Sequence, residues 1–188
     1  AILPDKGGNL LLGTLSALVS FNPEKKSFTT IDKEKDGTPF TSQRITILFR
    51  DSHKRLWVGG EEGISVFQQE GIEIEKVPIL PESSVTKTFT NCIYEAANGI
   101  IWVGTREGFY CFNEKEKKIK RYTTANGLPN NVVYGILEDT FGRLWVSTNR
   151  GISCFNPETE RFRNFTESDG LQSNQFNTSS FCRTSSGQ

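Results

Sequence analysis

Short runs of aromatic and β-branched residues, separated by clusters of Gly, Asn, Asp and Pro, follow one another along the chain. Residues 45–49, 56–60 and 64–67 form three such runs, and the polar segments 51–54 and 61–63 lie between them. Gly tolerates the positive φ of tight turns and Asp caps them, so the pattern predicts β-strands joined by hairpins. A helix would need about ten residues of 3.6-residue periodicity between breaks, which this sequence does not provide. The chain is therefore predicted to be all-β.

One motif occurs four times at nearly constant spacing. Leu56-Trp57-Val58-Gly59, Ile101-Trp102-Val103-Gly104 and Leu144-Trp145-Val146-Ser147 follow a divergent first copy, Leu10-Leu11-Leu12-Gly13. Their second positions are 46, 45 and 43 residues apart, and ten residues after each comes a Phe, namely Phe21, Phe67, Phe112 and Phe155. A repeat of this length made of short strands is typical of the four-stranded antiparallel blades of a β-propeller.

The repeat phase divides the chain into approximate units at 1–44, 45–90, 91–131 and 132–173, followed by a lone strand within 174–188. In the fourth unit, strands A to D are predicted at 132–138, 144–148, 152–155 and 162–165. Asp5 aligns with Asp51 and Asp139, so the first blade is predicted to be incomplete, beginning at the turn after a missing strand A. Residues 176–184 are predicted to form a strand A that either completes the first blade or belongs to a larger ring, which we favour.

Strand B is apolar at every position of its Leu-Trp-Val motif, which predicts that both of its faces are covered. Trp57, Trp102 and Trp145 are therefore interpreted as wedges between neighbouring sheets about 10 Å apart. A binding role is the alternative, but repetition at one register favours packing.

The fourth unit resembles the two-component regulator propeller repeat. The resemblance is carried by Asp139, Gly142, Trp145, Gly151 and the pair Asn156-Pro157, followed by Phe162, Phe165 and an Asp-Gly-Leu loop. Residues 170–177 are also similar to a late-blade segment of that family. The chain departs from the repeat at Leu11 for Trp, Ala17 for the hairpin Gly, Lys54 for the turn Gly and Ala96 for the turn Asp.

The resemblance implies a fragment of about four blades from a ring of about seven. It also implies the periplasmic sensor domain of a hybrid two-component system, a membrane receptor with a cytoplasmic histidine kinase that responds to glycan fragments. We accordingly expect a non-catalytic, ligand-sensing domain. The alternatives are a protein-interaction or dimerisation scaffold and, less favoured, a glycan hydrolase or lyase. Open blade edges are expected to be covered by the rest of the receptor or by another copy of the chain.

Candidate binding residues lie where B–C hairpins and D–A loops meet, because alternate connections of an up-and-down sheet share one end. They are Arg106, Glu107, Asn149 and Arg150 in the hairpins and Asn130, Asn131 and Asn174 in the loops. Their amide, carboxylate and guanidinium groups suit the hydroxyl and acidic groups of an oligosaccharide. Turns themselves favour Asn, so a structural role is the alternative for each Asn, whereas turns do not require Arg106 or Arg150.

The composition of the chain limits which partners and which catalytic residues are expected. The 22 basic residues balance the 22 acidic ones, so neither nucleic acid nor an anionic membrane is an expected partner. No apolar run approaches the ~18 residues of a membrane span, so this segment is not expected to insert into a membrane. The only histidine, His53, is predicted to be a solvated turn residue, and Asp51 and Asp139 are interpreted as turn acceptors rather than catalytic carboxylates.

The four cysteines, Cys92, Cys111, Cys154 and Cys182, lack the spacing of a zinc site, so no metal or cofactor is expected. Cys111 and Cys154 hold the same position in adjacent blades. Blade sheets about 10 Å apart are too distant for a disulfide, which predicts that these two thiols are unpaired.

Overall fold

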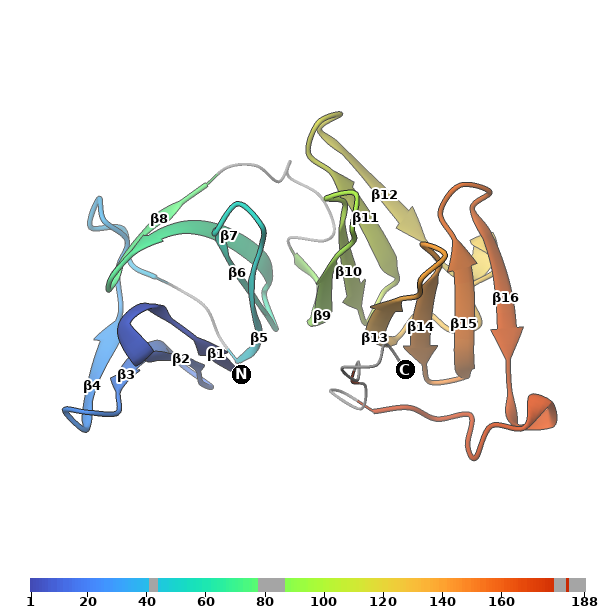
Figure 1. The fold of residues 1–188 in the computed structure, drawn as a ribbon, viewed down its shortest axis with the longest axis horizontal. Helices are drawn as coiled ribbons and strands as arrows, with labels where there is room; N and C mark the ends of the chain where they lie inside the picture. The colour runs from blue at the N-terminus through green and yellow to red at the C-terminus, as the bar shows by residue number, and fades with distance from the viewer. Residues whose placement is uncertain (41–43, 78–86, 178–181, 183–188) are drawn as a thin grey trace. The chain divides into compact units, whose positions relative to one another are not determined.

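Each of the four repeats folds into a four-stranded antiparallel sheet in the computed structural model, which describes residues 1–40, 44–77, 87–177 and 182 (Figure 1). In every sheet the strands pair in chain order, which confirms the predicted all-β, up-and-down blades. The chain divides into two compact units, Ala1–Thr90 and Asn91–Gln188.

The first unit contains two sheets. The first sheet is made of β1 (Ile2–Pro4), β2 (Leu10–Gly13), β3 (Leu18–Asn22) and β4 (Ser27–Ile31). The second is made of β5 (Ile45–Arg50), β6 (Leu56–Gly60), β7 (Gly63–Glu70) and β8 (Glu73–Lys76).

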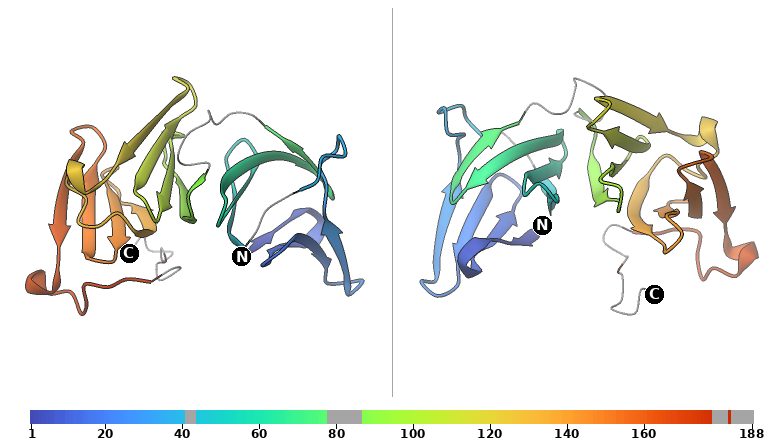
Figure 2. Two further views of the ribbon diagram at one scale, coloured as in Figure 1. Left: turned by 180° about the vertical axis from the view of Figure 1, so that it is seen from behind. Right: turned by 45° about the horizontal axis from the view of Figure 1, so that its top comes forward.

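The second unit contains the other two sheets, which lie side by side in both views of Figure 2. The third sheet is made of β9 (Thr90–Glu95), β10 (Ile101–Thr105), β11 (Phe109–Asn113) and β12 (Lys118–Tyr122). The fourth is made of β13 (Val133–Glu138), β14 (Leu144–Thr148), β15 (Gly151–Asn156) and β16 (Arg161–Phe165). Short 3-10 turns, η3 (Thr124–Asn126) and η4 (Glu167–Asp169), follow the outer strands β12 and β16.

The first blade is complete, which corrects the predicted absence of its strand A. Asp5 does begin the A–B turn, since its N–H donates to the Asn9 carbonyl oxygen at 2.8 Å, but three residues before it suffice for a strand. These residues, β1, pair with β2 in the register Leu3 to Leu11. The second correction is the length of β7, which continues through Glu70 rather than ending at Phe67.

The predicted lone strand within 174–188 falls mostly outside the described residues. Its described beginning, residues 174–177, forms no strand but is bonded to the hairpin between β14 and β15. The Gly151 N–H donates to the Asn174 carbonyl oxygen at 2.5 Å, and the Phe176 N–H donates to the Thr148 carbonyl oxygen at 3.2 Å.

Trp102 is a wedge between two sheets, as predicted. Its ring stacks on Phe109 of the same sheet at 4.8 Å between centroids and meets Phe155 of the fourth sheet edge-on at 5.5 Å. The residue after next, Gly104, permits this approach, because a Cβ there would lie 2.5 Å from Val133 Cγ1 in β13. The Trp-Val-Gly motif thus provides both the wedge and the space for the next blade.

Coverage of strand B differs between blades. Every residue of β6 and β10 is buried, including Trp57, as both-faced coverage requires. In β14 buried and half-buried positions alternate, and Trp145 is half-buried, which contradicts the prediction for this strand. The reason is that among the described residues no sheet follows β16, so Trp145 stacks only on Phe165 of its own sheet, at 5.5 Å.

A carboxylate ties the A–B turn to the tryptophan in two blades. Asp139 Oδ1 accepts from the Arg143 N–H at 3.0 Å, and Oδ2 accepts from Arg143 Nε at 2.8 Å and Trp145 Nε1 at 2.9 Å. Burial alone would raise the pKa of Asp139, but these hydrogen bonds outweigh it and hold the pKa below its ordinary value. Asp51 repeats the arrangement with Arg55 Nε at 2.6 Å and Trp57 Nε1 at 2.7 Å.

In the second and fourth sheets, the residue before the A–B turn bonds to the A–B turn of the preceding sheet. In the first unit, Arg50 Nη2 donates to Asp5 Oδ1 at 3.0 Å, and Gln69 Nε2 donates to Asp5 Oδ2 at 2.9 Å. In the second unit, Glu138 Oε2 accepts from the Ala97 N–H at 3.0 Å. Within each unit, these contacts join the two sheets at their A–B ends.

Candidate functional site

The predicted hairpin residues lie at the tips of two hairpins in the second unit. Thr105 Oγ1 donates to the Gly108 carbonyl oxygen at 2.9 Å and accepts from the Glu107 N–H at 3.0 Å. Thr148 makes the equivalent bonds in the next blade, with the Gly151 carbonyl oxygen and the Arg150 N–H, both at 3.0 Å. Both threonines are fully buried, so each tip is held by an internal hydroxyl.

The predicted side chains at these tips differ in their exposure to solvent. Arg106, Glu107 and Arg150 are exposed. The Glu107 carbonyl oxygen accepts from Arg121 Nε at 3.0 Å, and its carboxylate lies 4.0 Å from the same guanidinium. Asn149 is half-buried, and its Oδ1 accepts from the Tyr134 hydroxyl at 3.0 Å. The tips therefore carry exposed cations on hairpins that are held by internal hydrogen bonds.

The predicted asparagines of the D–A loops bond to the loop backbone. Asn131 Oδ1 accepts from the Thr124 N–H at 2.9 Å, and Asn174 Oδ1 accepts from the Glu167 N–H at 2.9 Å. Asn130 Oδ1 accepts from the Val132 N–H at 2.8 Å. These bonds support the structural alternative for the three asparagines. Their contact with a ligand stays a prediction.

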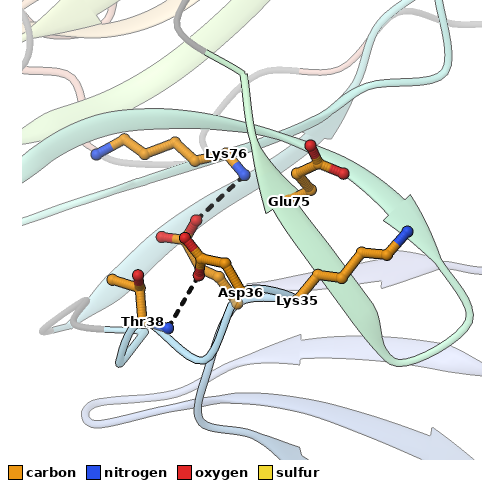
Figure 3. Close-up of a pocket in the computed structure, with 6 residues that line it drawn as sticks. Lys35, Asp36, Thr38, Glu75 and Lys76 are labelled. Atoms are coloured by element: carbon orange, nitrogen blue, oxygen red, sulfur yellow. Dashed lines mark hydrogen bonds between the residues drawn. The ribbon is translucent and has the colours of Figure 1, made fainter.

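An open cavity of about 560 Å³ lies in the first unit, at residues that the sequence pattern did not single out (Figure 3). The loop after β4 reaches β8, where the Lys35 N–H donates to the Ile74 carbonyl oxygen at 2.8 Å and Glu34 Oε2 accepts from the Lys76 N–H at 3.2 Å. The Thr38 N–H donates to Asp36 Oδ1 at 2.9 Å, and this bond holds the pKa of Asp36 below its ordinary value. The mixed charges fit a solvated loop that covers the outer edge of β8.

Within residues 1–40, 44–77, 87–177 and 182, no cluster of three His, Cys, Asp or Glu residues is arranged to hold a metal ion, and no helix is long and apolar enough to span a membrane. His53 is exposed, with Nδ1 3.5 Å from Arg55 Nη2.

All four cysteines are free, including the pair predicted to be unpaired, Cys111 and Cys154. Cys92 is buried, and burial raises the pKa of its thiol to about 12. A thiol with that pKa is protonated at neutral pH and behaves as a small apolar side chain.

Comparison with known proteins identifies a family that this chain matches. Residues 83–107 and 127–150 match the family described as the two-component regulator propeller. Over 133 residues the chain is 32% identical to a histidine kinase of Formosa agariphila, an alignment that covers 67% of this chain and 10% of the relative. The chain therefore spans about a tenth of that relative's length.

Two solved structures share the fold. One is the extracellular domain of a protein assigned to a hybrid two-component system of B. thetaiotaomicron, with a TM-score of 0.70 and 20% identity over 99% of this chain and 31% of that chain. The other is virginiamycin B lyase from Staphylococcus aureus, with a TM-score of 0.58 and 17% identity over 87% of this chain and 54% of that chain. At these identities the likeness concerns the fold, which receptors and enzymes share.

Proposed function

The chain belongs to the two-component regulator propeller repeat family, and from this premise we propose that it is part of the ligand-sensing, periplasmic region of a two-component receptor. The observation that carries the proposal is the match of two repeats to this family together with the alignment to a histidine kinase. The fold shared with an extracellular domain of a hybrid two-component system supports the same assignment. In such a receptor the ligand acts by binding two arrangements of the protein with unequal affinity.

The proposed ligand is a carbohydrate fragment. Exposed Arg106 and Arg150 at the ends of hairpins fixed by buried threonines provide charge-assisted donors for an acidic sugar. Asn149 and Glu107 lie beside them in the same hairpins and supply polar groups for hydroxyls. This group of residues is the proposed contact for the acidic part of an oligosaccharide.

Isothermal titration of the chain with neutral and uronate-containing oligosaccharides tests this function. We expect at least one acidic oligosaccharide to bind, and we expect the double variant Arg106→Ala, Arg150→Ala to bind it at least tenfold more weakly with an unchanged melting temperature. The control variant Lys115→Ala, Arg161→Ala removes the same charge from exposed residues in and beside the C–D turns and should bind normally. Equal affinities of both double variants would exclude the hairpin tips, and failure of every oligosaccharide would contradict carbohydrate sensing.

The proposed domain binds its ligand without converting it. Its only histidine is an exposed turn residue, and Asp51 and Asp139 are bonded to Arg and Trp side chains within the fold. Oligosaccharides incubated with the chain should be recovered unchanged by chromatography. Appearance of shorter or unsaturated products would favour the glycan hydrolase or lyase alternative.

A further inference from the structure

The third blade lacks the carboxylate that binds tryptophan in the second and fourth. Ala96 stands where Asp51 and Asp139 accept the indole N–H, six residues before the tryptophan. Trp102 is only 2% exposed, yet among the described residues none accepts a hydrogen bond from its Nε1–H. Buried donors in native proteins almost always have a partner, so this N–H requires an explanation.

A cavity of about 270 Å³ lies in the second unit at this point. It is bounded by the A–B turns of the third and fourth sheets and by the C–D turn of the fourth, and both Ala96 and Trp102 line it. The indole N–H of the other two tryptophans is directed at the residue in the position of Ala96. The N–H of Trp102, which has no acceptor among the described residues, is therefore expected to lie on the side of Ala96 and the cavity. Without a carboxylate at position 96, the turn has a cavity beside it, and the buried Trp102 N–H lies at the inner wall of that cavity.

An exposed aromatic ring borders the same cavity. Phe141 lines it from the A–B turn of the fourth sheet and is 80% exposed. Its backbone is fixed, because its N–H donates to Asp139 Oδ1 at 2.9 Å, and the Arg143 guanidinium carbon lies 5.0 Å from its ring centroid. A single exposed Phe is common on protein surfaces, but here it provides a flat apolar wall beside an unpaired buried donor.

The charges around the cavity determine the kind of ligand. Glu138 and Glu158 line it with carboxylates, while the guanidinium of Arg143 is already paired with Asp139 at 2.8 Å. This excess of negative charge disfavours an anionic ligand. A hydroxyl group suits it, because one hydroxyl can accept from the Trp102 N–H and donate to a carboxylate oxygen of Glu138 or Glu158.

We propose that this cavity binds one neutral sugar ring. Trp102 Nε1 donates to an oxygen of the sugar, Phe141 packs against its C–H face, and the carboxylates of Glu138 and Glu158 accept from its hydroxyls. The volume, just below the roughly 300–1,000 Å³ of drug-sized ligand pockets, suits a single ring rather than a long chain. The inference rests on the proposed function in taking a carbohydrate as ligand, but it places this sugar at the A–B end of the sheets, away from the arginine-bearing hairpin tips.

Nuclear magnetic resonance of the three indole N–H groups in the intact chain tests the site. The chain is titrated with the methyl glycosides of glucose, galactose, mannose and fucose, and with methyl glucuronide as the anionic counterpart. Trp102→Phe identifies the Trp102 signal by its disappearance. At least one neutral glycoside should shift this signal downfield, with smaller changes at Trp57 and Trp145, and the glucuronide should bind at least tenfold more weakly.

Two variants separate this site from a general affinity for sugars. Phe141→Ala alters an exposed side chain and should weaken the neutral glycoside at least tenfold without changing the melting temperature. Ala96→Asp restores the internal acceptor, so it should move the Trp102 signal toward those of Trp57 and Trp145 without ligand and should abolish binding.

The outcomes distinguish the two proposals. A Trp102 signal unmoved by every neutral glycoside, or normal binding by both variants, overturns the sugar cavity. Binding of acidic oligosaccharides that depends on Arg106 and Arg150 would still support the proposed function in that case. Conversely, the hairpin tips are excluded and the cavity is retained if a neutral glycoside moves the Trp102 signal while acidic oligosaccharides either fail to bind or bind the Arg106→Ala, Arg150→Ala variant as well as the wild type.

Discussion

The first residue of the A–B turn has three different environments in the four sheets, and the neighbouring residues determine which one forms. Where Arg and Trp follow at the fourth and sixth positions, the carboxylates of Asp51 and Asp139 bond to both. Asp5 has no such Trp, because Leu11 replaces it, and its carboxylate binds Arg50 and Gln69 of the next sheet instead. Where Ala96 stands in place of the aspartate, a cavity lined by Ala96 and Trp102 lies beside the turn.

The Asp139 carboxylate is predicted to make folding pH-dependent. Its folded pKa lies below the unfolded value, so its stabilisation is complete above the ordinary Asp pKa of about 3.9 and is lost as pH falls through the folded pKa. Asp139→Asn should lower the free energy of unfolding by about 1–3 kcal/mol at pH 7, because charge-assisted bonds to Arg143 and Trp145 are lost.

Urea unfolding at pH 7 and at successively lower pH measures this effect. The difference between wild type and Asp139→Asn should shrink as the pH falls below about 4. Glu158→Gln, an exposed carboxylate in the neighbouring turn, serves as the control and should change stability little. A constant difference at every pH would mean that ionisation of Asp139 does not contribute.

The sequence predicted part of this residue-scale chemistry. Asp51 and Asp139 were recognised as turn acceptors, and the six-residue interval to Trp was visible. The indole bond was not inferred, because a spacing between side chains does not show their orientation. Because the sequence does not reveal the indole bond, Ala96 stands out only as a departure from the repeat, and the cavity beside Trp102 cannot be predicted.

Among the secondary-structure elements, the A–B turns share one backbone conformation despite different residues. Gly8, Gly99 and Gly142 have φ of 77°, 80° and 73°, and Lys54 adopts 65° at the equivalent position. The substitution of Lys for Gly therefore left the turn geometry unchanged. A side chain in this left-handed region costs about 1–2 kcal/mol.

Lys54→Gly is predicted to stabilise the chain by about 0.5–1 kcal/mol. Relief of the left-handed strain exceeds the roughly 0.4–1 kcal/mol that Gly costs through the entropy of the unfolded chain. The reciprocal change Gly142→Lys should destabilise, since a Cβ there meets nothing within 4 Å and only the backbone conformation opposes it. Chemical denaturation of both variants checks the pair, and a loss of stability in Lys54→Gly would refute the explanation.

Strand prediction succeeded where the apolar motif was strong. The predicted ranges 56–60 and 144–148 coincide with β6 and β14. Strand β1 was missed because three residues give no periodic pattern, and β7 was predicted too short because its last residues, Gln68 to Glu70, are polar. The hairpin threonines were also missed, since a lone Thr is common in any strand.

At the scale of the whole molecule, the packing of one sheet on the next provides the stability of each unit. Trp102 contacts Phe109 in its own sheet and Phe155 in the neighbouring sheet, so its ring belongs to both blades. In repeat proteins such nearest-neighbour interfaces carry much of the folding free energy. Loss of this ring should therefore weaken both sheets of the second unit together.

Trp102→Ala is predicted to lower the free energy of unfolding by about 3–5 kcal/mol, the usual cost of removing a large buried aromatic side chain. Hydrogen exchange should show the loss of protection concentrated in β9 to β16. Trp145→Ala removes a half-buried ring that stacks on a single Phe and should cost less. A loss below about 1 kcal/mol for Trp102→Ala would disprove its role as an inter-sheet wedge.

The bonds that precede the A–B turns of the second and fourth sheets differ in polarity. Arg50 meets the carboxylate of Asp5, whereas Glu138 meets the bare amide of Ala97 and the hydroxyl of Tyr94. Transplanting the second blade behind the third would bring a guanidinium to an amide donor, and placing the fourth behind the first would oppose two carboxylates. Although the four sheets have the same topology, the polar groups at their A–B ends differ. A different order of the sheets would therefore bring together polar groups that cannot bond to one another.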